Sequence, residues 1–175
     1  MDAAAIAEFE DISLRTTTHG DLASVLLMEQ APDNAEWVEQ WSEDKHREAM
    51  DNSDNAHWIV QGQPDDRLIG YVILAGLKNP ARSLEFTRIV IGEKGGGYGK
   101  KTLKLVARVA FEQCGAHRLW LDVMEHNHRA RHVYQIVGFV EEGTLRECMI
   151  VDGRFVSLVV MSLLDHEYRS LYKQE

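Results

Sequence analysis

The sequence predicts a mixed α/β fold of the α+β kind, in which helices cover both faces of one mostly antiparallel sheet. Two helical segments early in the chain precede a run of strands joined by short turns, and two later helices each follow a strand. Near the C-terminus, Asp152-Gly153 separates two further strands and suits a type I′ hairpin turn. With 175 residues and 45% hydrophobic content, the chain can bury one core, so we expect a single domain over residues 1–175.

The first half of the chain contains both helical and strand patterns. Trp37, Val38 and Trp41 recur at helical spacing in an acidic segment, which favours a long amphipathic helix there. A stretch rich in turn residues, from Gly62 to Asp66, joins two apolar runs and predicts a hairpin. In order, we expect a strand at residues 13–15, helices at 21–30 and 34–50, and strands at 57–61 and 68–75.

The second half alternates strands with amphipathic helices. Leu103, Val106 and Phe111 fall on one side of its first helix, and Gly115 ends that helix. In order, we expect a strand at 84–91, a helix at 98–113, a strand at 117–123, a helix that opens near residue 127, strands at 144–151 and 154–163, and a short helix at 165–172.

A glycine-rich loop, Lys94-Gly95-Gly96-Gly97-Tyr98-Gly99-Lys100-Lys101, joins the strand at 84–91 to the next helix. Glycines let consecutive backbone N–H groups turn toward a ligand, and the free amides of a helix N-terminus add partial positive charge. The loop therefore predicts an anion site that suits phosphate. Its lysines lie at the start of the helix, where the helix dipole disfavours positive charge, in a chain of net charge -9. This placement indicates a negative partner. A flexible loop with a solvated lysine face is the alternative.

A second motif lies about thirty residues downstream, with the spacing Asn127-x-Arg129-Ala130-x-x-x-Tyr134-x-x-x-Gly138-Phe139. It follows the spacing Lys-x-x-Gly-x-Gly at Lys94, Gly97 and Gly99. The ordered pair resembles the GCN5-related N-acetyltransferase (GNAT) family, whose members transfer acetyl from acetyl-CoA to an amine. The resemblance extends from Leu68 to Leu163. Lys94 departs from the family pattern, in which Gln or Arg is more usual.

The resemblance implies a fold, a cosubstrate and a set of binding residues. The implied fold is a splayed, mostly antiparallel sheet of six to seven strands with helices on both faces, and the pantetheine arm of acetyl-CoA lies in the gap between two strands. The implied activity is acetyl transfer to a primary amine by direct attack in a ternary complex. The implied cofactor-binding residues are Ile89, Ile91, Lys94, Gly95, Gly96, Gly97, Tyr98, Gly99, Lys100 and Asn127.

Acetyl transfer to an alkylamine needs a base, because an amine with a pKa of about 10.4 is almost entirely ammonium at neutral pH. Glu85 resembles the strand carboxylate that some family members use through a water, so it is the candidate base. Pairing with Arg82 or Arg88, or exposure to solvent, is the alternative. The departing thiolate needs a proton donor. Tyr134 is the candidate by resemblance, two helical turns after Asn127, and core packing is the alternative.

The cysteines and histidines favour structural roles. Cys114 and Cys148 match no CxxC or metal spacing, so we expect buried thiols in a reducing compartment rather than a disulfide or a nucleophile. His128 and His132 lie four residues apart on one helix, but no Cys or HExxH pattern accompanies them. We therefore expect no metal.

Charge and hydropathy limit the partners and the location. A net charge of -9 argues against nonspecific nucleic-acid binding and favours a cationic acceptor. No apolar run is long enough to span a bilayer, and residues 1–10 carry acids rather than a basic signal-peptide head. We therefore expect a cytoplasmic protein with no membrane partner. Edge strands near the C-terminus would allow a homodimer.

The identity of the acceptor is left open. The tail from Leu145 through Met161 resembles the subgroup that acetylates ribosomal-protein N-termini and polyamines, so we expect a small amine or a peptide N-terminus. Amino acids and drug amines stay open, because variable segments form the pocket. One alternative function is a non-catalytic acyl-CoA-binding regulatory module. Another glycine-rich nucleotide-binding fold ranks last, because no Lys-Ser/Thr pair follows the loop.

Overall fold

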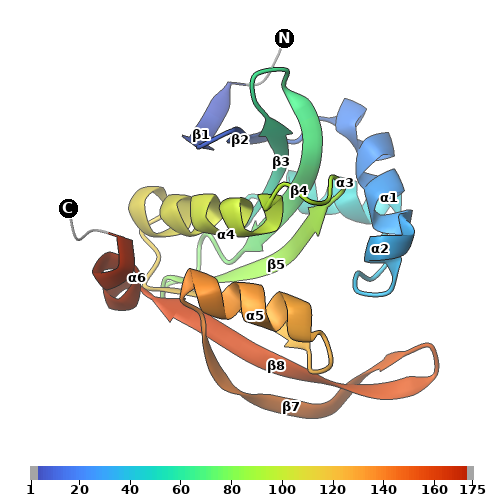
Figure 1. Ribbon diagram of the computed structural model, residues 1–175, viewed down its shortest axis with the longest axis vertical. Coiled ribbons are helices and arrows are strands. Elements are labelled where there is room, and N and C mark those ends of the chain that lie inside the picture. The colour runs from blue at the N-terminus through green and yellow to red at the C-terminus, as the bar shows by residue number, and fades with distance from the viewer. Residues whose placement is uncertain (1–3, 173–175) are drawn as a thin grey trace.

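The strands form one eight-stranded sheet with helices on both of its faces (Figure 1). The structure is a computed structural model that describes residues 4–172. The strands are β1 (Ala5–Phe9), β2 (Ile12–Thr16), β3 (Asn55–Gly62), β4 (Arg67–Ala75), β5 (Ser83–Ile91), β6 (Arg118–Met124), β7 (Val140–Val151) and β8 (Arg154–Leu164). The helices are α1 (Leu22–Gln30), α2 (Pro32–Ala35), α3 (Glu43–Asp51), α4 (Tyr98–Arg108), α5 (His128–Val137) and α6 (Asp165–Tyr172). A 3-10 turn (His19–Asp21) precedes α1, and a π-helical turn (Val109–Gln113) extends α4.

The strand order is β1-β2-β3-β4-β5-β6-β8-β7, and all neighbours are antiparallel except β5 and β6. This confirms the mixed, mostly antiparallel sheet, but the described residues form eight strands rather than six to seven. The additional strand is β1, which shows no clear apolar alternation and pairs with β2 at the edge of the sheet. Strand formation there depends on the neighbouring strand, so local pattern did not reveal it.

β5 and β6 pair over three rungs and then separate. The rungs are Ser83 with Arg118, Leu84 with Leu119 and Glu85 with Trp120. Beyond Glu85, β5 stays paired with β4 as far as Ile91, and β6 stays paired with β8 as far as Met124. A gap therefore opens in the middle of the sheet, as the family resemblance implied.

A β-bulge changes the face on which β5 presents its side chains. Phe86 and Arg88 pair with adjacent residues of β4, so Thr87 between them is the extra residue. Phe86 and Ile89 consequently belong to the same apolar core, although they are three residues apart. Arg88 lies on the opposite face, where it meets Glu29. The bulge thus places a buried cation next to the gap.

Two apolar clusters hold helices on opposite faces of the sheet. The larger cluster includes Leu103 and Val106 of α4 and Val137 of α5. The smaller one contains Val25 of α1 with Tyr71 of β4. Figure 1 shows α4 and α5 in front of the sheet, one on either side of the gap, and α3 behind β4. Helices from both layers therefore border the gap.

The long helix predicted for residues 34–50 is wrong, because α2 and α3 form there with a loop at residues 36–42 between them. Ser42 is the N-cap of α3, and its side chain accepts a hydrogen bond from the Lys45 amide at 3.2 Å. The loop also folds inward, since the Trp41 amide donates to the Glu29 carboxylate at 3.0 Å. These contacts override the helical spacing of the tryptophans.

The turn predicted at Asp152-Gly153 is confirmed, but the burial predicted for the cysteines is wrong. Asp152 and Gly153 have φ of 48° and 75°, and both central residues of a type I′ turn need positive φ. Cys114 and Cys148 are free thiols, yet both are exposed. Cys114 directly follows the last turn of the α4 extension, and Cys148 lies in β7, whose side chains are mostly exposed. Neither position is covered by a packed layer.

No helix within residues 4–172 is long and apolar enough to cross a membrane. The cytoplasmic location and the homodimer stay predictions, although β7 does form one edge of the sheet.

Candidate active site

A cleft of about 630 Å³ occupies the gap between β5 and β6. α2 and the loop after it form one wall, and the glycine-rich loop and the first turns of α4 form another. The start of α5 lies opposite, and Met149 and Leu158 reach the cleft from β7 and β8. The cleft is therefore bounded by elements from both faces of the sheet.

Most of the predicted site residues meet in this cleft. The lining residues among them are Ile89, Ile91, Lys94, Gly95, Gly97, Tyr98, Gly99, Lys100, Asn127 and Tyr134. Gly96 does not line the cleft and has a packing role, because a Cβ there would lie 2.3 Å from the Tyr98 ring. Glu85 does not line the cleft either. The structure thus brings the predicted phosphate loop and the predicted acid together in the cleft, but the predicted base does not line it.

The glycine-rich loop presents open backbone at one end of the cleft. Gly95 and Gly97 have φ of 91° and 68°, in the left-handed region that favours glycine. A Cβ at Gly95, Gly97 or Gly99 would meet no protein atom within 4 Å, so open space adjoins these positions. Gly97 is the N-cap of α4, which has no side-chain cap. The free amides of the first turn are therefore available to an anion.

The lysines near the loop have different partners. Lys94 lines the cleft and donates to the Asn34 side-chain oxygen at 2.6 Å, and burial lowers the pKa of Lys94. Lys100 also lines the cleft. Lys101 instead pairs with Asp11 at 2.6 Å, so a protein carboxylate offsets its charge at the start of the helix. Lys94 and Lys100 are consequently the lysines of this loop that face the cleft.

α5 positions both Asn127 and Tyr134. The Asn127 side chain accepts a hydrogen bond from the Ala130 amide at 3.1 Å, so this residue caps α5 and also lines the cleft. Within residues 4–172, the Tyr134 hydroxyl makes no hydrogen bond. Burial, and then the negative charge of Asp122, raise the pKa of Tyr134 to about 12. Tyr134 is therefore protonated at neutral pH and able to donate.

Glu85 and Asp122 lie where the two strands separate. Glu85 occupies the last paired rung, and within the described residues it forms no ion pair with Arg88 or any other side chain. Burial, and then the charge of Asp122, raise the pKa of Glu85. Asp122 lies two residues beyond Trp120, the rung partner of Glu85, and lines the cleft. Asp122 is not among the site residues predicted from the sequence, although strand alternation with its buried neighbours places it on the face opposite the core.

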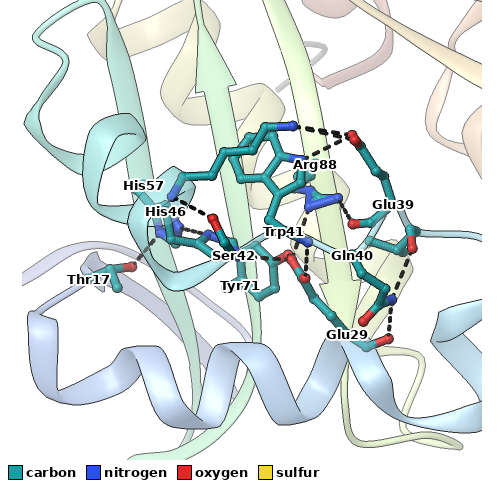
Figure 2. Close-up of polar contacts among 12 residues, drawn as sticks. Thr17, Glu29, Glu39, Gln40, Trp41, Ser42, His46, His57, Tyr71 and Arg88 are labelled. Atoms are coloured by element: carbon teal, nitrogen blue, oxygen red, sulfur yellow. Dashed lines mark hydrogen bonds and ion pairs between the residues drawn. The ribbon is translucent and has the colours of Figure 1, made fainter.

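A buried polar network connects α1 and α3 to β4 and β5 (Figure 2), and its members Trp41 and Arg88 also line the cleft. At its centre is the Glu29 carboxylate, which is 1% exposed. It accepts hydrogen bonds from Arg88 at 3.0 Å, His46 at 3.0 Å, the Trp41 amide at 3.0 Å, and the Tyr71 hydroxyl. One carboxylate therefore joins α1, α3, β4, β5 and the loop between α2 and α3.

Arg88 ties the loop between α2 and α3 to β5. Its guanidinium donates to the Glu39 backbone carbonyl and lies 4.2 Å from the centre of the Trp41 ring. Burial by itself raises the pKa of Glu29, but its hydrogen bonds, of which that from His46 is the strongest, outweigh burial and lower the pKa. Glu29 is therefore ionised at neutral pH. Its charge offsets that of Arg88, which also lines the cleft.

The network continues away from the cleft. His46 is hydrogen-bonded to His57 at 3.0 Å, and His57 to the Thr17 hydroxyl at 2.8 Å. Burial, and then the neighbouring His46, lower the pKa of His57 to about 4, so His57 is neutral at pH 7. This network is not predictable from the sequence. Its members come from separate elements and share no local spacing that could have signalled it.

Comparisons with known proteins identify relatives of this chain. The model of the acetyltransferase (GNAT) family matches residues 23–139. A spermidine N(1)-acetyltransferase from Escherichia coli is 26% identical over 171 residues, which cover 93% of this chain and 90% of that protein. One from Vibrio cholerae is 27% identical, over 90% of this chain and 95% of that protein. The crystal structure of the Vibrio cholerae spermidine N-acetyltransferase in complex with CoA and spermine has a TM-score of 0.81, at 25% identity, and the match covers 90% of this chain and 98% of that one.

Replacing Gly97 by Ala is expected to weaken acetyl-CoA binding, because a Cβ would stand between the loop amides and a phosphate. Binding to the folded state stabilises a protein by about 2.7 kcal/mol at a ligand concentration of 100 Kd. The measurement is the rise in Tm on addition of acetyl-CoA, which should be largely lost in Gly97→Ala.

Gly115→Ala is the matched control for the backbone strain. Gly115 has φ of 67°, close to the 68° of Gly97, and a Cβ at either position would meet no protein atom within 4 Å. Gly115 does not line the cleft. The acetyl-CoA shift should survive in this control, and equal losses in both variants would contradict an anion site at the loop.

Replacing Glu29 by Gln is expected to destabilise the fold by about 3–5 kcal/mol, because it leaves the buried Arg88 without a counter-ion. Side chains of Glu29 and Arg88 are 1% and 7% exposed, so water cannot compensate the lost charge. Urea denaturation measures the free energy of unfolding. Glu36→Gln, at an exposed glutamate of the neighbouring loop, should change it by less than about 0.5 kcal/mol. Similar effects of the two substitutions would show that the ion pair does not hold the loop.

Proposed function

The chain belongs to the acetyltransferase (GNAT) family and is an acetyl-CoA-dependent N-acetyltransferase that acts on an amine; we propose that its acceptor is a polyamine. Relatives that span nearly the whole chain are spermidine N-acetyltransferases. The comparisons lend no support to the alternative of a non-catalytic acyl-CoA-binding module, because the named relatives are enzymes.

The distribution of carboxylates in the cleft carries the proposal for a polyamine. Asp122 lies at the inner end, where β5 and β6 separate, and Asp33 lies on the α2 wall; Glu39 of the same wall already pairs with Lys45 at 3.4 Å. Trp37 lines the same wall and offers a ring face to a cation, whereas the Trp41 ring already lies against Arg88 at 4.2 Å and Lys45 at 4.4 Å. Negative groups at two places in one cleft suit a molecule that carries ammonium groups at a distance from each other. A monoamine would use only one of them.

The open glycine-rich loop fits the cosubstrate. In the proposed complex, backbone amides from Gly95 to Lys100 hold the pyrophosphate, since nothing in the protein occupies the space next to them. The backbone of Ile89 and Ile91 pairs with the pantetheine amides along the stretch of β5 that β6 has left. Asn127 contacts the cosubstrate from the α5 side while it caps that helix.

The proposed reaction is direct attack of the acceptor amine on the thioester in a ternary complex. Glu85 is the proposed base, and its raised pKa makes its carboxylate a better proton acceptor at neutral pH. Tyr134 is the proposed acid, which gives its hydroxyl proton to the departing sulfur. Because Glu85 does not line the cleft, a proton from the amine needs a further group to reach it.

A panel of acceptors tests the proposal for a polyamine. We expect kcat/KM for spermidine to exceed that for hexylamine by about 10-fold, because a second ammonium group adds roughly 1.4 kcal/mol of favourable interaction with the α2 wall. Release of free CoA thiol measures turnover, and a short peptide with a free N-terminus completes the panel. Preference for the peptide, or equal use of spermidine and hexylamine, would refute a polyamine acceptor.

Tyr134→Phe is expected to lower kcat by about 10- to 1000-fold, because the hydroxyl acts on the departing sulfur in the transition state. The dissociation constant of acetyl-CoA, measured by titration calorimetry, should stay within about twofold of the parent value. Tyr168→Phe is the control, since that hydroxyl donates to Glu112 outside the cleft. Unchanged turnover in Tyr134→Phe would assign Tyr134 to packing alone.

A further inference from the structure

Asp122 lies on β6 directly after the point where β5 and β6 separate. Its neighbours Leu121 and Val123 are buried in the core that α4 and α5 cover. By strand alternation, Asp122 therefore lies on the opposite face, on the same side as Trp120 and its rung partner Glu85. Asp122 is exposed and lines the cleft, whereas Glu85 is half-buried and does not line it. A ligand in the cleft meets Asp122 before Glu85.

The charge of Asp122 has no partner among residues 4–172. Two other carboxylates of the cleft do have partners, since Glu93 pairs with Arg67 at 2.9 Å and Glu39 with Lys45 at 3.4 Å, whereas Asp33 on the α2 wall has no ion-pair partner among the described residues. Burial raises the pKa of Asp122, as expected where no nearby cation compensates the negative charge. An ammonium group beside Asp122 would supply that compensation.

Asp122 also acts electrostatically on both groups proposed for proton transfer. Burial is the larger cause of the raised pKa of both Tyr134 on α5 and Glu85 on β5, and the negative charge of Asp122 is the second cause. These effects place Asp122 within electrostatic reach of the acid and of the base. Building on the amine acetylation described above, we propose that Asp122 binds the reacting ammonium group of the acceptor and relays its proton to Glu85.

The relay balances the protons of the reaction. One N–H bond of the ammonium group breaks, its proton passes to the Asp122 carboxylate and then to Glu85, and Asp122 becomes an anion again. The freed lone pair of the amine forms the N–C bond with the acetyl carbon, and the C–S bond breaks. Tyr134 donates its proton to the sulfur and takes the second proton from the nitrogen of the new amide. Glu85 finally releases its proton to water.

The test compares Asp122→Asn with Glu125→Gln in the full chain. Both substitutions remove one negative charge near the end of β6, but Glu125 does not line the cleft. We expect Asp122→Asn to lower kcat/KM for spermidine by about 100-fold, and Glu125→Gln to change it by less than about threefold. The acetyl-CoA shift in Tm should be unchanged in both. If the Asn variant does not fold, Asp122→Ser is measured in the same way.

A relay also predicts how Asp122 and Glu85 combine. The double variant with Asp122→Asn and Glu85→Gln should lose no more activity than the worse single variant, because both groups serve one proton path. Raising the pH toward the amine pKa of about 10.4 should narrow the deficit of Asp122→Asn, since more acceptor arrives uncharged.

Three results would overturn the relay. The first is that Asp122→Asn keeps an activity within about threefold of that of Glu125→Gln. The second is that the losses of the two single variants add fully in the double variant. The third is that the deficit of Asp122→Asn does not change with pH. If the parent enzyme prefers another primary amine to spermidine, the proposal for a polyamine fails. The same variants are then compared with that preferred amine, so the relay is tested separately.

Discussion

The separation of β5 from β6 after Glu85 is the constraint on which the rest of the site depends. A continuous sheet would isolate its two faces, because paired backbone fills the space between neighbouring strands. Here three rungs hold the strands together at one end, and beyond them the sheet is open. Groups from both helical layers therefore reach a common cleft. The cleft needs no insertion into the fold, since it is a gap within the sheet itself.

The open sheet explains how the proposed acid and the proposed base can act on one reaction from opposite sides. Tyr134 comes from α5, in the layer whose core contains Leu103 and Val106. Asp122 lies on the other face of β6, on the side of Glu85. In the proposed reaction the amine loses its proton on one side, and the sulfur gains a proton from the other. The two proton transfers therefore do not compete for one group.

The helices on the α1 and α3 face of the sheet are held by charge as much as by apolar packing. The smaller core cluster contains few residues, and the Glu29 carboxylate joins the surrounding elements through four hydrogen bonds. The β-bulge at Thr87 is what brings Arg88 to this face. A buried ion pair costs desolvation, but loss of one partner would cost more, so the pair fixes the loop between α2 and α3 beside the cleft. Stability of the fold and shape of the proposed acceptor wall therefore depend on the same contact.

The sequence by itself determined most strands and helices, the glycine-rich loop, the Asp152-Gly153 turn and the family motif, because glycine torsions, caps and apolar periodicity depend on neighbours within a few residues. Only the tertiary structure decided that Asp122 and not Glu85 lines the cleft, because that depends on where two strands stop pairing. It also decided that Arg88 meets Glu29, 59 positions earlier in the chain, and that the loop at residues 36–42 interrupts a predicted helix. Contacts over such separations leave no periodic pattern, since they are set by strand register and by the packing of whole elements.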